Sequence, residues 1–231
     1  MNQSTFLRTA LTTAVLLALP VGAMAQSTGR LYDAMPPQNS SYVRVITAAG
    51  TPVDVLVDGK VRVRNLAVKT ASPYLIVPKG THHIQLSSKG KSLGGLSVNT
   101  AAQGAYTLAF PTTSAKPYLF ADRTGTNKLK SILAVYNMAP GAGGVTVSAS
   151  NNDGGAMVVF ANLAAGRPAT IEVNPIQVKL NLIGKGSPTA RASTSLDMSP
   201  GAAYSVFVFP NGARGISAKS TQNTIERYLG K

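Results

Sequence analysis

The sequence lacks cysteine and tryptophan altogether, and its 231 residues include only two histidines and eight acidic residues. Without cysteine the chain has no disulfide, no thiolate nucleophile and no zinc–thiolate site. The histidines, His82 and His83, are adjacent, and neighbours on a strand point to opposite faces, so they cannot act as a pair on one substrate. No closely spaced acidic pair on a helix occurs. We therefore predict no catalytic residue, no metal site and no cofactor.

Long apolar runs are also missing. The one apolar stretch near the N-terminus covers residues 11–21, follows Arg8, and ends at the small-x-small cleavage pattern of residues 23–25. It is too short to span a bilayer. Residues 1–25 therefore predict a cleavable secretory signal peptide, with Gln26 as the new N-terminus. No cysteine stands at the cleavage point, which argues against a lipid anchor. We expect a protein that works outside the cytoplasm, with no membrane span.

Negative charge is scarce. The chain has 22 Lys and Arg against eight Asp and Glu, a formal net charge of +14. Such a charge favours contact with polyanions, and export makes nucleic acid the least suitable of them. Arg44, Lys60, Arg62 and Arg64 stand at alternating positions of neighbouring predicted strands, so they would share a sheet face if those strands pair. We predict a polyanion-binding face at Lys60, Arg62 and Arg64; an ordinary solvated face is the alternative.

Short runs that alternate apolar and polar residues fill the rest of the chain, and Gly, Pro, Asn and Ser separate them. This pattern predicts an all-β protein. Asp58-Gly59 between two such runs predicts a hairpin turn, because both residues tolerate a positive φ. Only residues 221–229 suggest a helical turn. The expected strands cover residues 42–46, 53–57, 60–64, 83–86, 105–110, 132–136, 145–147, 157–160, 171–173, 178–182 and 204–209.

The two halves of the chain resemble each other. Three segments recur in the same order at offsets of about 90–98 residues: 42–45 with 133–137, 75–86 with 171–180, and 104–111 with 202–210. Internal repetition at this length predicts two tandem β-sandwich domains. We place the N-terminal domain at 26–111, a linker that contains Pro, Thr and Lys at 112–128, and the C-terminal domain at 129–231. The aromatic island at 118–120 would tether the linker to one domain.

The segment at residues 29–45 contains Leu31-Tyr32-Asp33, a Pro-Pro pair, and an aromatic-Val-Arg-Val strand. It resembles the opening of the alginate biosynthesis protein AlgF family. Residues 71–74, 78–80 and 174–180 are similar to that family too. The resemblance implies a periplasmic protein, built from two β-sandwich domains, that is required for O-acetylation of an exopolysaccharide. In that family acetyl groups pass from a membrane acyltransferase to periplasmic transferases, and AlgF acts as an adaptor between them.

We therefore expect a non-catalytic periplasmic adaptor whose partners are the polysaccharide O-acetyltransferase proteins of the periplasm and inner membrane. Leu31, Tyr32, Asp33 and Arg44 are the predicted partner contacts. One alternative is a carbohydrate-binding module for an anionic polysaccharide, although the scarcity of aromatic residues argues mildly against stacking platforms. Another is an acetyltransferase that uses His82 or His83 as its base. The polymer is alginate or a related acetylated polymer such as cellulose.

Overall fold

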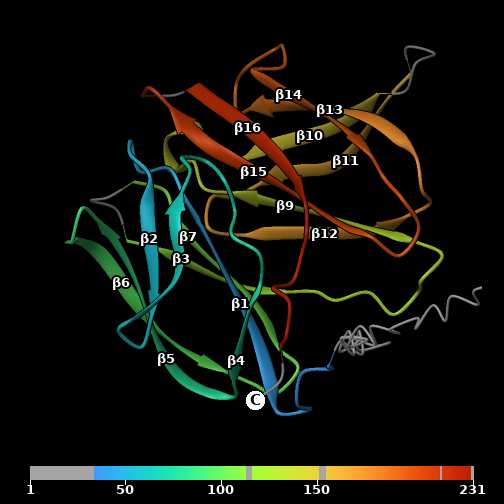
Figure 1. Cartoon of the computed structure of the whole chain (residues 1–231). Coiled ribbons are helices and arrows are strands. Elements are labelled where there is room, and N and C mark those ends of the chain that lie inside the picture. The colour runs from blue at the N-terminus through green and yellow to red at the C-terminus, as the bar shows by residue number, and fades with distance from the viewer. Residues whose placement is uncertain (1–33, 113–115, 151–154, 214, 230–231) are drawn as a thin grey trace, which may run out of the picture. The chain divides into compact units, whose positions relative to one another are not determined.

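Sixteen β-strands form nearly all of the regular structure in the computed structural model, which describes residues 34–112, 116–150, 155–213 and 215–229 (Figure 1). The one other regular element among them is a 3₁₀ turn, Pro140–Ala142. None of the described residues belongs to a helix that could cross a membrane. In chain order the strands are β1 (Ser40–Thr47), β2 (Val53–Val57), β3 (Lys60–Leu66), β4 (Leu75–Pro78), β5 (Gly80–Ser88), β6 (Lys91–Thr100), β7 (Ala105–Phe110), β8 (Tyr118–Asp122), β9 (Ser131–Asn137), β10 (Val145–Ser150), β11 (Ala156–Leu163), β12 (Pro168–Val173), β13 (Gln177–Gly184), β14 (Ala192–Asp197), β15 (Ala203–Asn211) and β16 (Gly215–Gln222).

The first eight strands form one sandwich. Its two sheets have the orders β4-β1-β7-β8 and β3-β2-β5-β6, and β1 runs parallel to β7 while the other pairs are antiparallel. The alternating valines of β1 and β2 point inward and are buried in a shared apolar core with Ile84 and Leu108. The predicted turn joins β2 to β3, with a φ of 50° at Asp58 and 76° at Gly59. The period-two pattern thus produces a sandwich core as expected.

The second eight strands repeat the first in the same topology. The orders β12-β9-β15-β16 and β11-β10-β13-β14 follow from the first sandwich by adding eight to each strand number, and β9 runs parallel to β15. Even single hydrogen bonds recur: the Tyr106 hydroxyl accepts from the Ala101 amide at 3.0 Å, and the Tyr204 hydroxyl accepts from the Ser199 amide at 3.1 Å. The prediction of two tandem β-sandwich domains is therefore confirmed.

A third apolar cluster lies between the two sandwiches. It joins side chains from β1, β7 and β8 to side chains from β9 and β15, so the outer faces of these two sheets cover each other. Aromatic rings form its centre: Tyr136 stacks on Phe207 with centroids 4.9 Å apart, and Phe120 meets Tyr136 edge-on at 5.2 Å. As a result β1 and β9 are buried on both faces for most of their length.

Two segments differ from the sequence-based expectation. The aromatic island within the predicted linker forms β8, which pairs with β7, so residues 123–130 connect the last strand of the first sandwich to β9. The helical turn predicted at 221–229 is wrong. There β16 ends at Gln222 and the chain continues extended, with Ile225 bridging Tyr74 beside β4. The open edge of β4 supplies backbone partners that an isolated helical turn would lack.

Candidate functional site

Arg44 is the largest of the fully buried side chains, with 1% of its surface exposed. It lies on the outer face of β1, where the second sandwich covers it. Its Nε donates to Thr107 Oγ1 at 2.8 Å, and its Nη1 donates to Asn223 Oδ1 at 2.6 Å. Its Nη2 donates to the Tyr136 hydroxyl at 3.1 Å and to Ser205 Oγ at 2.8 Å. Both sandwiches therefore contribute to one guanidinium site.

Asp122, at the end of β8, balances this charge through intervening hydroxyls. Its Oδ2 accepts from Thr107 Oγ1 at 2.5 Å and from the Tyr74 hydroxyl at 2.7 Å. Its Oδ1 accepts from the Tyr136 hydroxyl at 2.7 Å. Thr107 and Tyr136 thus each accept from Arg44 and donate to Asp122. We call this set the junction network; its members are Arg44, Tyr74, Thr107, Asp122, Tyr136, Ser205 and Asn223.

The tyrosines of the junction network remain protonated. Burial raises the pKa of Tyr74 and of Tyr136 well above the ordinary value, and the neighbouring Asp122 carboxylate adds to the rise while Arg44 opposes it. The Arg44 guanidinium also lies over the Tyr74 ring, 4.5 Å from its centroid. A neutral phenol that donates to a carboxylate is a structural group rather than a nucleophile.

A pocket of about 700 Å³ opens beside the junction network, at the end of the unit where β7 begins and β8 ends. Tyr74, Asp122 and Asn223 belong both to the network and to the pocket wall. Its volume lies in the range of sites for small ligands. Further lining residues include Tyr42, Gln103, Ala105, Arg123, Ile132, Pro200, Gln222 and Ile225. Aromatic rings, planar amides, one guanidinium and the Asp122 carboxylate form this wall.

The predicted basic face is found in part. Lys60, Arg62 and Arg64 alternate along β3, an edge strand, and all three are exposed. Arg62 also forms an ion pair with Glu226 of the C-terminal segment. Arg44 does not belong to this face, because β1 and β3 lie in opposite sheets and Arg44 is buried. A partner cannot reach Arg44, so its assignment as a partner contact is corrected.

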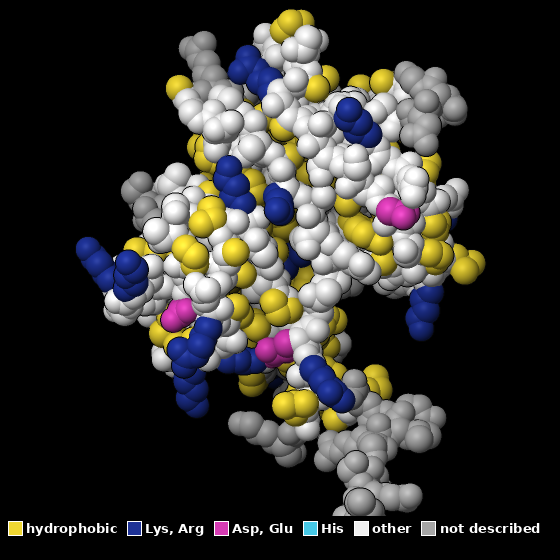
Figure 2. All heavy atoms as spheres, turned by 45° about the horizontal axis from the view of Figure 1, so that its top comes forward, with side chains coloured by type: hydrophobic (Ala, Val, Ile, Leu, Met, Phe, Trp, Pro, Cys, Tyr) yellow, Lys and Arg dark blue, Asp and Glu magenta, His cyan; other side chains and the backbone are white. Residues whose placement is uncertain are grey.

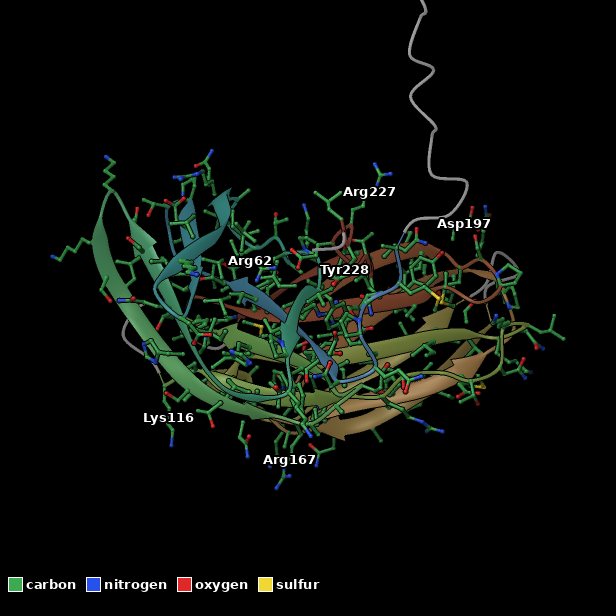
Figure 3. All side chains as sticks on the ribbon, turned by 60° about the horizontal axis from the view of Figure 1, so that its bottom comes forward. Arg62, Lys116, Arg167, Asp197, Arg227 and Tyr228 are labelled. Atoms are coloured by element: carbon green, nitrogen blue, oxygen red, sulfur yellow. The ribbon has the colours of Figure 1, made fainter. Side chains whose placement is uncertain are left out.

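The C-terminal segment reaches this face from the second sandwich. Tyr74 N donates to Thr224 O at 2.8 Å, and Glu226 N donates to Tyr74 O at 2.9 Å. The Glu226 carboxylate also accepts from Ile76 N at 2.7 Å. Figure 3 shows Arg62 on the same side of the unit as Arg227 and Tyr228. The segment therefore covers the β4 edge and leads Asn223 into the junction network.

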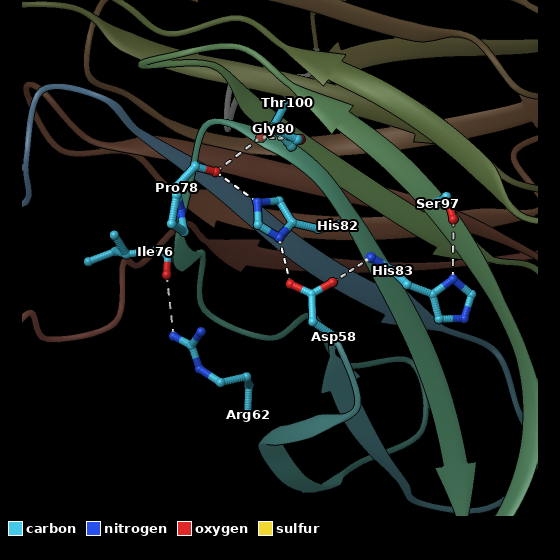
Figure 4. A network of polar contacts seen from close by, with 9 residues as sticks. All are labelled: Asp58, Arg62, Ile76, Pro78, Gly80, His82, His83, Ser97 and Thr100. Carbon is cyan, nitrogen blue, oxygen red and sulfur yellow. Dashed lines mark hydrogen bonds and ion pairs between the residues drawn. The ribbon is translucent and has the colours of Figure 1, made fainter.

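His82 is held on both ring nitrogens (Figure 4). Its Nε2 lies 2.8 Å from Pro78 O, an acceptor, so Nε2 carries a proton. Its Nδ1 lies 2.7 Å from Asp58 Oδ2. The hydrogen bonds from His82 and from the His83 amide lower the pKa of Asp58. Both ring nitrogens of His82 are therefore engaged within the protein.

His83 points to the other face of β5, as the strand geometry predicts (Figure 4). Its Nδ1 lies 3.3 Å from Ser97 Oγ, and both side chains are exposed. No acidic group orients this imidazole in the contacts found among the described residues. The same part of the chain contains no group of three or more His, Asp or Glu side chains that could hold a metal.

The sequence alone missed most of the junction network. Thr107 and Asp122 come from the first sandwich and Tyr136, Ser205 and Asn223 from the second, and the two sets meet at Arg44 where the sandwiches pack. One signal was available in the sequence. Ser41 and Ser131 are equivalent in the repeat, since each donates to a backbone carbonyl, and Arg44 and Ala134 each stand three residues further on. The first repeat therefore has a charged residue where the second has alanine. The predicted contacts Leu31, Tyr32 and Asp33, like the signal peptide, lie outside the described residues.

Comparison with known proteins gives a consistent match. Residues 14–202 match the family described as "Alginate O-acetyl transferase AlgF". The chain is similar to alginate biosynthesis protein AlgF of Pseudomonas fluorescens, at 30% identity over 177 residues and 76% of each protein. The Pseudomonas putida protein of the same name is 28% identical over 79% of this chain and 80% of its own length. That of Azotobacter vinelandii is 27% identical over 70% of each.

Among solved structures, the C-terminal domain of AlgF from P. aeruginosa aligns with 41% of this chain and 99% of its own length. The identity is 18% and the TM-score is 0.32, too low to support an argument about the fold. The strand orders themselves establish the two sandwiches.

Proposed function

Because the chain belongs to the AlgF family, whose members take part in alginate O-acetylation, we propose that it is a non-catalytic adaptor in the O-acetylation of an exopolysaccharide. In this role it works in the periplasm and links a membrane acyltransferase to periplasmic acetyltransferases. Alginate is the first polymer to test, since the relatives are named for it. Leu31, Tyr32 and Asp33 remain the proposed partner contacts.

The observation that carries the non-catalytic part is the engagement of His82. An acetyl transfer needs a nucleophile and a base poised together. Both ring nitrogens of His82 are occupied by contacts within the protein, and the tyrosines of the junction network are buried and protonated. The exposed His83–Ser97 contact is the arrangement nearest to such a dyad, and no third group among the described residues orients the base.

Histidine variants test this part. We expect His83→Ala and Ser97→Ala to leave the acetyl content of the polymer unchanged in a strain that carries only the variant protein. His82→Asn serves as the control for structure, because it disturbs the Asp58 contact without touching the exposed pair. Loss of acetylation in both exposed variants, with the protein folded and abundant, would make the chain an enzyme.

The adaptor part is tested by co-purification. A tagged protein recovered from cross-linked cells should carry acetylation components with it, and substitution of Leu31, Tyr32 and Asp33 by alanine should release them. The substitution Lys60→Ala/Arg64→Ala is the comparison, since it alters an exposed strand elsewhere. Recovery of no acetylation component from the unaltered protein would contradict the adaptor role.

The pocket favours carbohydrate binding as a second candidate function. Planar polar side chains and tyrosine rings, as found in its wall, match the hydroxyls and apolar faces of a sugar. Gln103 and Arg123 lie at the wall outside the junction network, so their alanine variants should stay folded. Titration calorimetry with oligosaccharides of the polymer should then show binding that both substitutions weaken. Absence of heat with every oligosaccharide tried would eliminate this candidate.

A further inference from the structure

The topology sorts the charged residues to different ends of the unit. Eight connections, which follow the odd-numbered strands β1 to β15, lie toward the left and upper left of Figure 1 and form one end of the unit. We call this the cationic end. In the described residues of these connections and at the first residue of β6, seven basic side chains occur and no acidic one: Lys69, Lys89, Lys91, Lys116, Arg167, Lys185 and Arg191.

The acidic residues lie mostly at the opposite end. Asp122, Glu172 and Asp197 stand within the last two residues of their strands there, and Asp58 occupies the β2–β3 turn. The acid closest to the cationic end along its strand is Asp54, which accepts from the Asn65 amide at 2.8 Å. Among the described residues, these acids offset basic side chains of the same end, such as Lys60, Lys79 and Arg123, whereas the connections of the cationic end contain basic side chains alone.

The cationic end is continuous across both sandwiches. Lys69, from the first sandwich, donates to Ser217 Oγ of the second at 2.9 Å. On the other flank Lys116 and Arg167 point away from the unit on the same side (Figure 3). Figure 2 shows Lys and Arg side chains spread over both halves of the molecule.

The composition of the cationic end indicates what it contacts. Its connections contain mainly Gly, Ala, Ser, Thr and Pro and no aromatic residue between 48–52, 67–73, 111–117, 138–144, 164–167 and 185–191. A protein interface is usually anchored by aromatic side chains, and the aromatic residues next to these connections, such as Tyr74 and Tyr118, are buried or half-buried within the protein itself. The pocket suited to a sugar opens at the opposite end. A broad basic surface without anchors or pocket matches a planar array of negative charge.

We propose that the cationic end rests on the anionic headgroups of a membrane surface. Six of the seven basic side chains, all but the half-buried Lys69, then act together, since a bilayer reaches all four sheets at once, whereas a single polymer strand would meet only a few of them. Contact of this kind orients the pocket and the C-terminal segment away from the bilayer. The proposal does not depend on the adaptor role.

The test compares two variants of equal net charge. The first replaces Lys89, Lys91, Lys116 and Lys185 at the cationic end by glutamine. The control replaces Lys60, Lys79, Lys128 and Lys179, which are exposed elsewhere on the unit, in the same way. The full-length exported protein and both variants are sedimented at low ionic strength with vesicles of phosphatidylglycerol and phosphatidylcholine, and with phosphatidylcholine alone. Urea unfolding confirms that each variant is folded.

We expect the unaltered protein and the control to bind the vesicles that contain phosphatidylglycerol and not those of phosphatidylcholine alone, and we expect added salt to release them. The first variant should bind at least about tenfold more weakly, since each basic residue near an anionic surface contributes roughly fivefold. Equal weakening in both variants would show that only net charge matters and overturn the proposal. Absence of vesicle binding by the unaltered protein would also overturn the proposal. So would a result in which the protein binds no vesicles but is retained on an alginate column, and the first variant loses that retention.

Discussion

Arg44→Met provides the sharpest test of the junction network. The substitution keeps most of the side-chain volume but removes the charge and four hydrogen bonds of 2.6–3.1 Å, three of them to Tyr136, Ser205 and Asn223 in the C-terminal half of the chain. It also leaves the Asp122 carboxylate without its compensating cation. The variant therefore isolates the polar part of the contact between the sandwiches from the packing part.

The magnitude follows from burial. Removing one partner of a buried charge pair costs about 3–5 kcal/mol. Asp122 borders the pocket, so water can solvate part of the carboxylate charge that Arg44 no longer balances. We therefore expect Arg44→Met to lower the free energy of unfolding by about 3 kcal/mol. Asp122→Asn should cost about 3–5 kcal/mol, because it strands a guanidinium of which only 1% is exposed. The double variant should recover about 1–3 kcal/mol relative to the sum.

Urea unfolding followed by far-ultraviolet circular dichroism measures all four proteins. A cost below about 1 kcal/mol for Arg44→Met would show that the network contributes little more than an exposed ion pair, and would refute the reasoning. Strict additivity in the double variant would show that Arg44 and Asp122 do not interact across the bridging hydroxyls. A control at the exposed Arg64, by substitution to Met, should change stability by less than about 0.5 kcal/mol.

Three further predictions concern pH and the C-terminal segment. Stability should fall above about pH 10, where the unfolded chain releases tyrosine protons that the folded protein retains, and Tyr136→Phe should make the fall shallower by about 1.4 kcal/mol per pH unit in alkaline urea titrations. Because His82 lowers the pKa of Asp58, the stability that this contact contributes is present at pH values above the ordinary carboxyl range and is lost as the pH falls below it. In acid titrations Asp58→Asn should weaken this dependence of stability on pH, and an unchanged profile would contradict the pairing. Truncation after Gln222 should destabilise the protein by about 2–3 kcal/mol through lost pairing and burial, whereas Glu226→Ala, which breaks only a part-exposed ion pair and a single amide contact, should cost about 1 kcal/mol by the same urea assay.

Local patterns explain what was predicted correctly. The valines of β1 and β2 alternate with polar residues, and this spacing alone commits them to a strand with one inward face. Asp58-Gly59 takes the turn that its backbone freedom allows. Because the same patterns recur about 90–98 residues later, the duplication was visible as well.

Arg44 shows where local patterns stop. Its position between Val43 and Val45 places it on the outward face of its own sandwich, as predicted, and Lys60 faces outward by the same rule. Only the packing of the second sandwich on β1 makes one of them buried and the other exposed. Which outward face is covered depends on contacts between residues far apart in the chain, such as Tyr136 and Ser205, and periodicity carries no information about them.

The sequence by itself determined the all-β class, the duplication, the turn at Asp58-Gly59 and the membership of the AlgF family, because each rests on neighbouring residues or on direct similarity. Tertiary structure alone decided that Arg44 and Asp122 meet, that the segment after Gln222 covers the β4 edge, and that basic residues gather at one end. The physical reason is that strand pairing and sheet packing bring together positions up to 179 residues apart, as between Arg44 and Asn223.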